Sequence, residues 1–236
     1  MEEKMSGTEI NIPCADGSMM GYLSMPPSGS GPGIVVMQEI FGVNQVMRDI
    51  TDAFAAQGFV ALCPDLFWRL EPGVNITDKT KAEWDKAFAL FGKFDRDKGV
   101  QDVQSTLNAL RKVKGCSGKA GATGFCLGGL LAYLTATRTD TDASVGYYGV
   151  NIPDFLAEAA NIKKPLMLHI AGKDGFVPPP AQQAMHAGLD GHKLCTLHDY
   201  PEQDHAFARM GGEHYDAAAA RLANDRTIAF FKKHLA

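Results

Sequence analysis

Residues 124–129 read Gly-Phe-Cys-Leu-Gly-Gly, and the rest of the chain is interpreted around this stretch. The small and apolar residues 119–123 suit a buried strand, and residues 130–137 suit a helix. A cysteine on a sharp strand-to-helix turn is typical of a catalytic nucleophile, and flanking glycines remove the Cβ atoms that would clash there. The helix start offers unpaired N–H groups and a positive dipole end, which favour a thiolate and later an oxyanion. Cys126 is therefore the candidate nucleophile.

Composition narrows the class of protein. The chain has 236 residues, 45% of them hydrophobic, so we expect a single domain over residues 1–236 with one substantial core. The net charge of −4, with both signs interspersed, gives no footprint for a nucleic acid or a membrane surface. Residues 1–7 lack the apolar core of a signal peptide, and no apolar run approaches the roughly 18 residues that cross a bilayer. The five cysteines form an odd number without framework spacing, which favours reduced thiols, and we expect a cytoplasmic monomer.

Strand and helix patterns alternate along the chain. Asp16-Gly17 separates two short strand patterns at residues 9–13 and 19–25, which predicts an antiparallel hairpin at the edge of a sheet. The alternation after it predicts an α/β fold, with a mostly parallel central sheet flanked by helices. Further strands are expected at residues 34–37, 59–63, 119–123, 143–148, 165–170 and 193–200, and helices around 46–54, 81–94, 103–110, 130–137, 153–160, 179–189 and 215–235.

Four polar side chains follow strands of this predicted sheet: Glu39, Cys126, Asp174 and His205. Ligands of open α/β sheets bind at the carboxyl ends of the strands, so these side chains are candidates for one site. The chain order of nucleophile, acid and histidine is the order expected of an α/β hydrolase. A packed cysteine, a turn-forming aspartate and a loop-capping histidine are the purely structural alternatives.

The chemistry of these residues predicts their roles. The Cys126 thiolate attacks a carbonyl, His205 takes and returns the proton, and Asp174 holds the imidazole tautomer. The backbone N–H groups of Leu127 and Ile40 are the expected oxyanion hole. Neither a cofactor nor a metal is predicted. The glycines at 118, 121 and 124 do not form a dinucleotide fingerprint, and on a strand Cys195 faces away from His192 and His198.

The sequence resembles the dienelactone hydrolase (carboxymethylenebutenolidase) family of α/β hydrolases. The matching stretches extend over nearly the whole chain in order: residues 38–42, 64–66, 124–129, 146–149, 171–174 and 204–207. The resemblance implies hydrolysis of a conjugated lactone, dienelactone, to maleylacetate. It also implies that Glu39 contacts the resting thiol, and that substrate binding leads to deprotonation of Cys126.

The resemblance further implies a substrate pocket that grips a carboxylate with two arginines. Arg209 matches one of them, whereas Trp84 stands where the other is expected, with Arg69 or Lys81 from the preceding loop as possible replacements. Two aromatic positions of that pocket correspond to Phe88 and Phe91 of this chain, and Tyr148 is a further candidate for substrate contact.

The predicted function is therefore cysteine-dependent hydrolysis of a small lactone or ester, through an acyl-enzyme, with a substrate that carries a carboxylate. A general carboxylesterase or thioesterase with a more apolar pocket is the main alternative. A further alternative is a non-enzymatic thiol-sensing module, which would have the same fold but would not hydrolyse a substrate. Cysteine-dependent amidotransfer is less favoured, because none of the seven histidines begins the sequence His-x-Glu.

Overall fold

The computed structural model describes residues 7–236. The chain divides into two compact units, one ending at Gly121 and one beginning at Ala122, and each is described by itself. The expectation of one domain stays a prediction. The argument against a signal peptide rests largely on residues 1–6, which lie outside the described residues.

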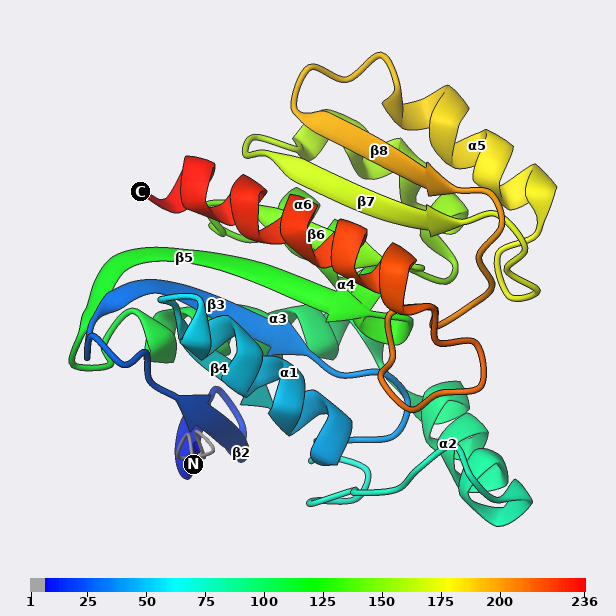
Figure 1. Ribbon diagram of the computed structural model, residues 1–236. Coiled ribbons are helices and arrows are strands. Elements are labelled where there is room, and N and C mark those ends of the chain that lie inside the picture. Colours follow the sequence, from blue (N-terminus) through cyan, green and yellow to red (C-terminus); the bar gives the residue numbers. More distant parts are fainter. Residues whose placement is uncertain (1–6) are drawn as a thin grey trace. The chain divides into compact units, whose positions relative to one another are not determined.

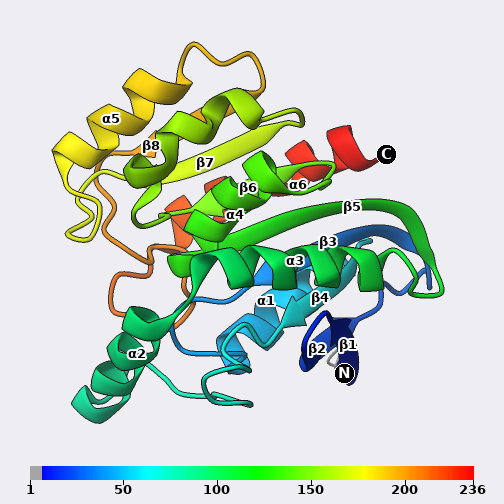
Figure 2. The same cartoon turned by 180° about the vertical axis from the view of Figure 1, so that it is seen from behind.

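The first unit is a small mixed sheet with helices on both faces. Its strands lie in the order β1-β2-β4-β3. Strand β2 is antiparallel to both of its neighbours, β1 and β4, whereas β3 is parallel to β4. Helix α1 covers one face and α3 the other (Figures 1 and 2). The elements are β1 (Thr8–Cys14), β2 (Gly17–Ser24), β3 (Gly31–Met37), α1 (Gln45–Ala56), β4 (Val60–Pro64), α2 (Lys81–Lys93) and α3 (Arg96–Leu110).

Local sequence signals explain where these elements begin. The predicted β1-β2 hairpin is present, but its two turn residues are Ala15 and Asp16, because Gly17 already pairs with Cys14 in the ladder. Helix α1 begins after Asn44, whose side-chain oxygen accepts the Met47 N–H at 3.1 Å. Helix α2 begins after Thr80, whose hydroxyl accepts the Glu83 N–H at 3.3 Å and donates to the Glu83 carboxylate at 2.8 Å.

The second unit is a parallel sheet in the order β5-β6-β7-β8. Helix α6 lies on one face, and α4, η1 and α5 lie on the other (Figures 1 and 2). Strand β5 begins in the first unit and ends in the second. The elements are β5 (Cys116–Phe125), α4 (Leu127–Arg138), β6 (Ser144–Tyr147), η1 (Ile152–Asn161), β7 (Leu166–Ala171), α5 (Pro179–Leu189), β8 (Cys195–Tyr200) and α6 (Ala217–Leu235).

Several expected elements differ from the observed ones. Helix α3 begins at Arg96 rather than near residue 103, and β5 extends over Cys116–Phe125 rather than residues 119–123. The segment Ile152–Asn161 is a 3-10 helix rather than an α-helix. Helix α4 begins at Leu127, directly after Cys126, because the glycines in its first turn pack closely against neighbouring backbone and do not break it. Helix α6 begins at Ala217, where the Asp216 carboxylate caps it by accepting the Ala219 N–H at 2.8 Å.

His169 is a satisfied core histidine, as its apolar strand indicates. Its Nδ1 lies 2.8 Å from the Tyr200 hydroxyl, and its Nε2 lies 3.0 Å from the Thr227 hydroxyl of α6. Burial lowers the pKa of His169 well below the usual value, and the positive charges of His198 and Arg226 lower it further. Among residues 7–236, none of the helices combines the length and the apolar character that a bilayer crossing needs.

Candidate active site

Cys126 occupies a strained turn between β5 and α4. Its backbone has φ 56° and ψ −111°, a conformation that is unfavourable for a residue with a Cβ. A Cβ on Gly124 would lie 2.1 Å from the Gly128 carbonyl oxygen, and one on Gly129 would lie 2.5 Å from the Tyr147 carbonyl oxygen. Only glycine therefore fits at both positions, which explains the sequence around the nucleophile.

The second unit brings the three predicted catalytic side chains together. His205 Nδ1 lies 2.8 Å from Asp174 Oδ2, and the His205 ring also hydrogen-bonds to the Cys126 side chain. The other Asp174 oxygen accepts the N–H groups of Phe176 and Val177 at 2.8 and 3.2 Å. The carboxylate is thus fixed on both sides, and it can hold one imidazole tautomer with the other ring nitrogen toward sulfur.

The charges in this group favour the imidazolium form of His205. Burial by itself lowers the pKa of His205, because a charged ring loses its hydration. The negative charge of Cys126 and the hydrogen bonds to Asp174 and Cys126 outweigh burial, and they raise the pKa of His205 to about 10. A charged imidazole held beside the Cys126 side chain suits a cysteine nucleophile, whose reactive form is the thiolate.

We expect the removal of the sulfur to lower the pKa of His205. In Cys126→Ala the attractive charge is lost while the burial remains, so the pKa should fall by about one to three pH units. Histidine ring signals followed by NMR titration would measure the change. The His186 ring, which lies between Asp190 and Asp199 at 3.0 Å from each, is the internal control and should not move. An identical His205 titration in both proteins would mean that sulfur carries no charge at rest.

The raised pKa of His205 contributes to stability in a defined pH range. The folded-state pKa of His205, about 10, lies above the ordinary value of 6.5. The contribution is therefore complete below about pH 6.5 and is lost as the pH rises through about 10.

The start of α4 carries Leu127, whose N–H is the predicted oxyanion donor. Leu127 is the first residue of this helix, so its N–H has no carbonyl partner within the helix. The Cys126 carbonyl oxygen accepts from Gly129 and Leu130 at 3.0 and 3.2 Å, which fixes the first turn. The positive end of the helix dipole therefore lies beside the nucleophile.

Two further strained residues surround His205. Tyr148 has φ 37°, and its ring meets the His205 ring edge to face at 5.1 Å. Ala206, the residue after the histidine, has φ 64°, in the left-handed region that alanine rarely adopts. Arg209 ends the same turn, because its N–H donates to the Ala206 carbonyl at 2.9 Å, and its side chain is buried.

Sequence reasoning missed Phe176. Its ring meets the His205 ring at 4.8 Å, and 53% of the residue is exposed to solvent. A large apolar side chain that is half exposed beside the His205 ring is accessible to a small molecule in solution. The available signal was its position two residues after Asp174, in a loop that follows a buried strand.

Glu39 and Ile40 belong to the first unit, directly after β3. Both are buried. The Gln38 side chain holds their turn, since its amide nitrogen donates to the Glu39 carbonyl at 3.3 Å and its oxygen accepts the Leu66 N–H at 3.0 Å. The proximity of Glu39 and Ile40 to Cys126 stays a prediction.

Two of the three predicted pocket aromatics of α2 lie together. Trp84 and Phe88 stack with ring centroids 5.5 Å apart, and Phe41 meets Trp84 edge to face at 5.0 Å. The Trp84 indole is fixed by its hydrogen bond to the Asp78 carbonyl at 3.0 Å. Phe91 packs under the Arg96 guanidinium, 5.8 Å from its ring centroid.

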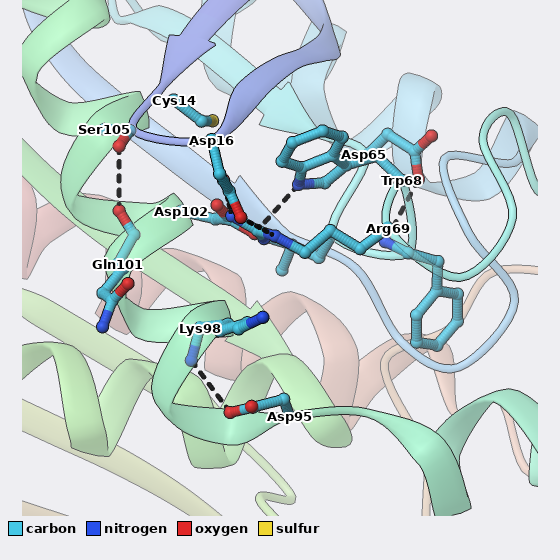
Figure 3. A network of polar contacts seen from close by, with 12 residues as sticks. Cys14, Asp16, Asp65, Trp68, Arg69, Asp95, Lys98, Gln101, Asp102 and Ser105 are labelled. Carbon is cyan, nitrogen blue, oxygen red and sulfur yellow. Dashed lines mark hydrogen bonds and ion pairs between the residues drawn. The ribbon is translucent and has the colours of Figure 1, made fainter.

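Arg69, the suggested substrate contact, has partners within the first unit, and its role toward a substrate stays a prediction. Its guanidinium forms ion pairs with Asp16 and Asp102 and lies over the Trp68 ring at 4.3 Å (Figure 3). These contacts engage the donors that a substrate carboxylate would need. Lys81, the other suggested replacement, pairs with Asp85 at 2.6 Å on the surface of α2.

Known proteins are similar to this chain over nearly its whole length. A protein of Azospirillum brasilense named "Putative carboxymethylenebutenolidase" is 51% identical over 97% of this chain and 99% of its own length. The carboxymethylenebutenolidase of Pseudomonas putida is 38% identical over 94% of both chains. A crystal structure from Klebsiella pneumoniae, described as a "Putative Dienelactone Hydrolase", has a TM-score of 0.86 and 25% identity over 98% of this chain and 99% of its own.

These relatives confirm the α/β-hydrolase fold that the strand and helix pattern predicts. The model of the dienelactone hydrolase family matches residues 19–235, which is nearly the whole chain. The chain is therefore a carboxylic ester hydrolase that belongs to the dienelactone hydrolase family.

Proposed function

We propose that the chain hydrolyses a lactone or ester through a covalent acyl-enzyme on Cys126. The observation that carries this proposal is the hydrogen-bonded series Asp174–His205–Cys126 in the second unit, with sulfur on a strained turn at a helix start. Each group has a chemical role in acyl transfer, and a purely structural cysteine needs neither the strain nor the imidazole.

The reaction would proceed in two halves. The Cys126 thiolate attacks the carbonyl carbon, and the Leu127 N–H, together with that of Ile40, stabilises the oxyanion. When the C–O bond breaks, the His205 imidazolium protonates the leaving oxygen, which in a lactone remains attached to the acyl group. Neutral His205 then takes a proton from water, the hydroxide attacks the thioester, and the carboxylate product leaves as the thiolate forms again.

Glu39 would control the resting state of the nucleophile. By the family resemblance, its carboxylate contacts the Cys126 thiol until substrate binds. Such control makes chemical sense because a permanently exposed thiolate is open to oxidation. The activity would be that of a cytoplasmic monomer acting on a small molecule.

The substrate is proposed to carry a carboxylate next to an unsaturated, flat portion. Arg209 is the candidate for the carboxylate, since a buried guanidinium can bind both oxygens of one carboxyl group. The stacked Trp84 and Phe88 pair is the candidate for the flat portion, because such rings prefer stacked or edge-to-face contacts.

We expect Arg209→Ala to discriminate between substrates. For lactones and esters with a carboxylate, kcat/KM should fall about 10²-fold, since a charge-assisted pair of hydrogen bonds is lost. For uncharged aryl esters of the same size, the change should stay within about threefold. A panel of matched substrates, with and without the carboxylate, would measure both effects.

The panel also tests the function itself. If the wild-type protein hydrolyses none of these lactones or esters, the proposed function is wrong. An equal loss on charged and neutral substrates would contradict only the role of Arg209. Efficient turnover of neutral esters would favour a general carboxylesterase, for which the half-exposed Phe176 beside His205 is the supporting observation.

A further inference from the structure

We infer that Asp102 is a positioning residue for the turn that carries Glu39 and Ile40, acting through the Trp68–Arg69 segment. This inference rests on the proposed function, because Ile40 and Glu39 act there on the oxyanion and the thiol. All of the contacts that support it lie within the first unit.

The first step is the contact between Asp102 and the segment that follows β4. Asp102 lies on α3, and its side chain is only 2% exposed. One of its oxygens, Oδ2, accepts the Trp68 indole N–H at 3.0 Å and pairs with the Arg69 guanidinium (Figure 3). A buried carboxylate needs such a counter-charge, so the helix and the segment are firmly linked.

Arg69 links a third segment to the same point. Its Nε and Nη2 atoms donate to the Asp16 carboxylate at 3.0 and 2.6 Å, and Asp16 lies in the β1-β2 turn. The guanidinium is also held over the Trp68 ring. The Cys14 thiol lies in the same network. Burial and the charge of Asp102 raise the pKa of Cys14 to about 11, so the thiol stays neutral there.

The second step is the contact between this segment and the Glu39–Ile40 turn. Leu66, two residues before Trp68, donates its N–H to the Gln38 side chain, which in turn donates to the Glu39 carbonyl. The Asp65 carboxylate accepts the Gly73 N–H at 2.7 Å and so closes the loop that begins here.

The other end of this loop contacts the turn from its far side. The Ile76 N–H donates to the Phe41 carbonyl at 3.1 Å, and the Ile76 carbonyl accepts from the Asn44 side chain at 2.9 Å. Gly42 pairs with Asn75, and a Cβ on Gly42 would lie 1.9 Å from the Val74 carbonyl oxygen. The loop and the turn therefore fit together closely, and a shift of one moves the other.

The Asp102→Asn variant separates charge from shape. Oδ1 of Asp102 is buried without a hydrogen-bond partner among residues 7–236, so an asparagine amide group can occupy its place while the remaining oxygen still accepts from Trp68. We expect kcat to fall about tenfold and KM to stay within about twofold, because a displaced oxyanion donor weakens the transition state and not the ground state.

Arg69→Gln and the double variant test the same contact from the other side. Arg69→Gln leaves a buried carboxylate without its counter-charge, so it should lower kcat more than Asp102→Asn does. Combining Arg69→Gln with Asp102→Asn removes the buried charge as well, and kcat should recover at least about threefold over Arg69→Gln alone. Such recovery is expected only if the two side chains act as a pair.

The Glu71→Gln variant is the matched control. Glu71 lies on the same loop but pairs with Lys86 at the surface, at 2.5 Å with both side chains more than 40% exposed. Its kcat should stay within about twofold of wild type. The chain has two tryptophans, so NMR of the indole N–H groups gives a direct reading, and the Trp68 signal should shift in Asp102→Asn but not in Glu71→Gln.

The outcomes distinguish this inference from the proposed function. If Asp102→Asn lowers thermal stability but the folded variant keeps the wild-type kcat, the network supports only the fold and the inference is wrong. If Cys126→Ala is inactive in the same assay, the proposed function remains intact. Full activity of Cys126→Ala would remove the proposed function and, with it, the role of the Glu39–Ile40 turn.

Discussion

Replacing Cys126 by alanine is expected to lower kcat/KM for lactones and esters by at least about 10⁴-fold. The variant lacks the sulfur that forms the acyl-enzyme, and the remaining imidazole can only activate water without a covalent intermediate. The fold should persist, because alanine is smaller than cysteine and can adopt the same strained turn. Steady-state kinetics with an activated aryl ester, together with circular dichroism, would measure both properties.

Cys195→Ala is the control for this experiment. Cys195 is also a free cysteine of the second unit, in β8, and burial raises the pKa of its thiol to about 11. Its removal should leave kcat/KM within about twofold of wild type. Rapid quenching with an aryl ester should leave the acyl group on the Cys126 peptide, as read by mass spectrometry. Acylation of another residue, or undiminished turnover by Cys126→Ala, would rule out the proposed nucleophile.

Replacing Asp174 by asparagine is expected to lower kcat by about 10³-fold to 10⁴-fold. The amide keeps the size of the side chain but cannot both accept from the Phe176 and Val177 N–H groups and hold His205 in its present tautomer. The Asp174 contribution to the raised pKa of His205 is also lost, so protonation of the leaving oxygen becomes less effective.

The kinetics of Asp174→Asn should be compared with those of Asp190→Asn, an exposed aspartate that pairs with His186 on the surface of the same unit. The control should behave like wild type. A fall in kcat that appears equally in both variants would point to a general loss of charge. A wild-type kcat in Asp174→Asn would show that His205 needs no orienting carboxylate.

Much of the fold was predictable because the relevant signals are local. The hairpin beside Asp16-Gly17 and the start of α2 follow from turn and capping residues that act within a few positions. Helix α5 begins with a proline, which suits the first position of a helix. The start of α4 was placed three residues late. Glycine has low helix propensity, so the glycines around Cys126 did not suggest a helix start. Their presence is explained only by the close approach of Gly124 and Gly129 to other backbone atoms.

The candidate site was predictable in part for the same reason. Cys126, Asp174 and His205 each follow a strand, and parallel strands bring such residues to one edge of a sheet. Arg69 could not be placed in this way. Its partner Asp102 lies 33 residues away on α3, and neither hydropathy nor spacing indicates a pair between a loop and a helix at that separation. Phe176 was missed because an exposed aromatic in a loop has no periodic neighbours to mark it.

The left-handed conformation of Ala206 has an evolutionary and engineering consequence. Glycine at this position would relieve a local cost of about 1–2 kcal/mol, so a search for more thermostable variants should select it readily. Yet glycine would also widen the range of directions that the neighbouring imidazole can sample. Selection for heat resistance would thus favour glycine at position 206, whereas selection for turnover would favour alanine.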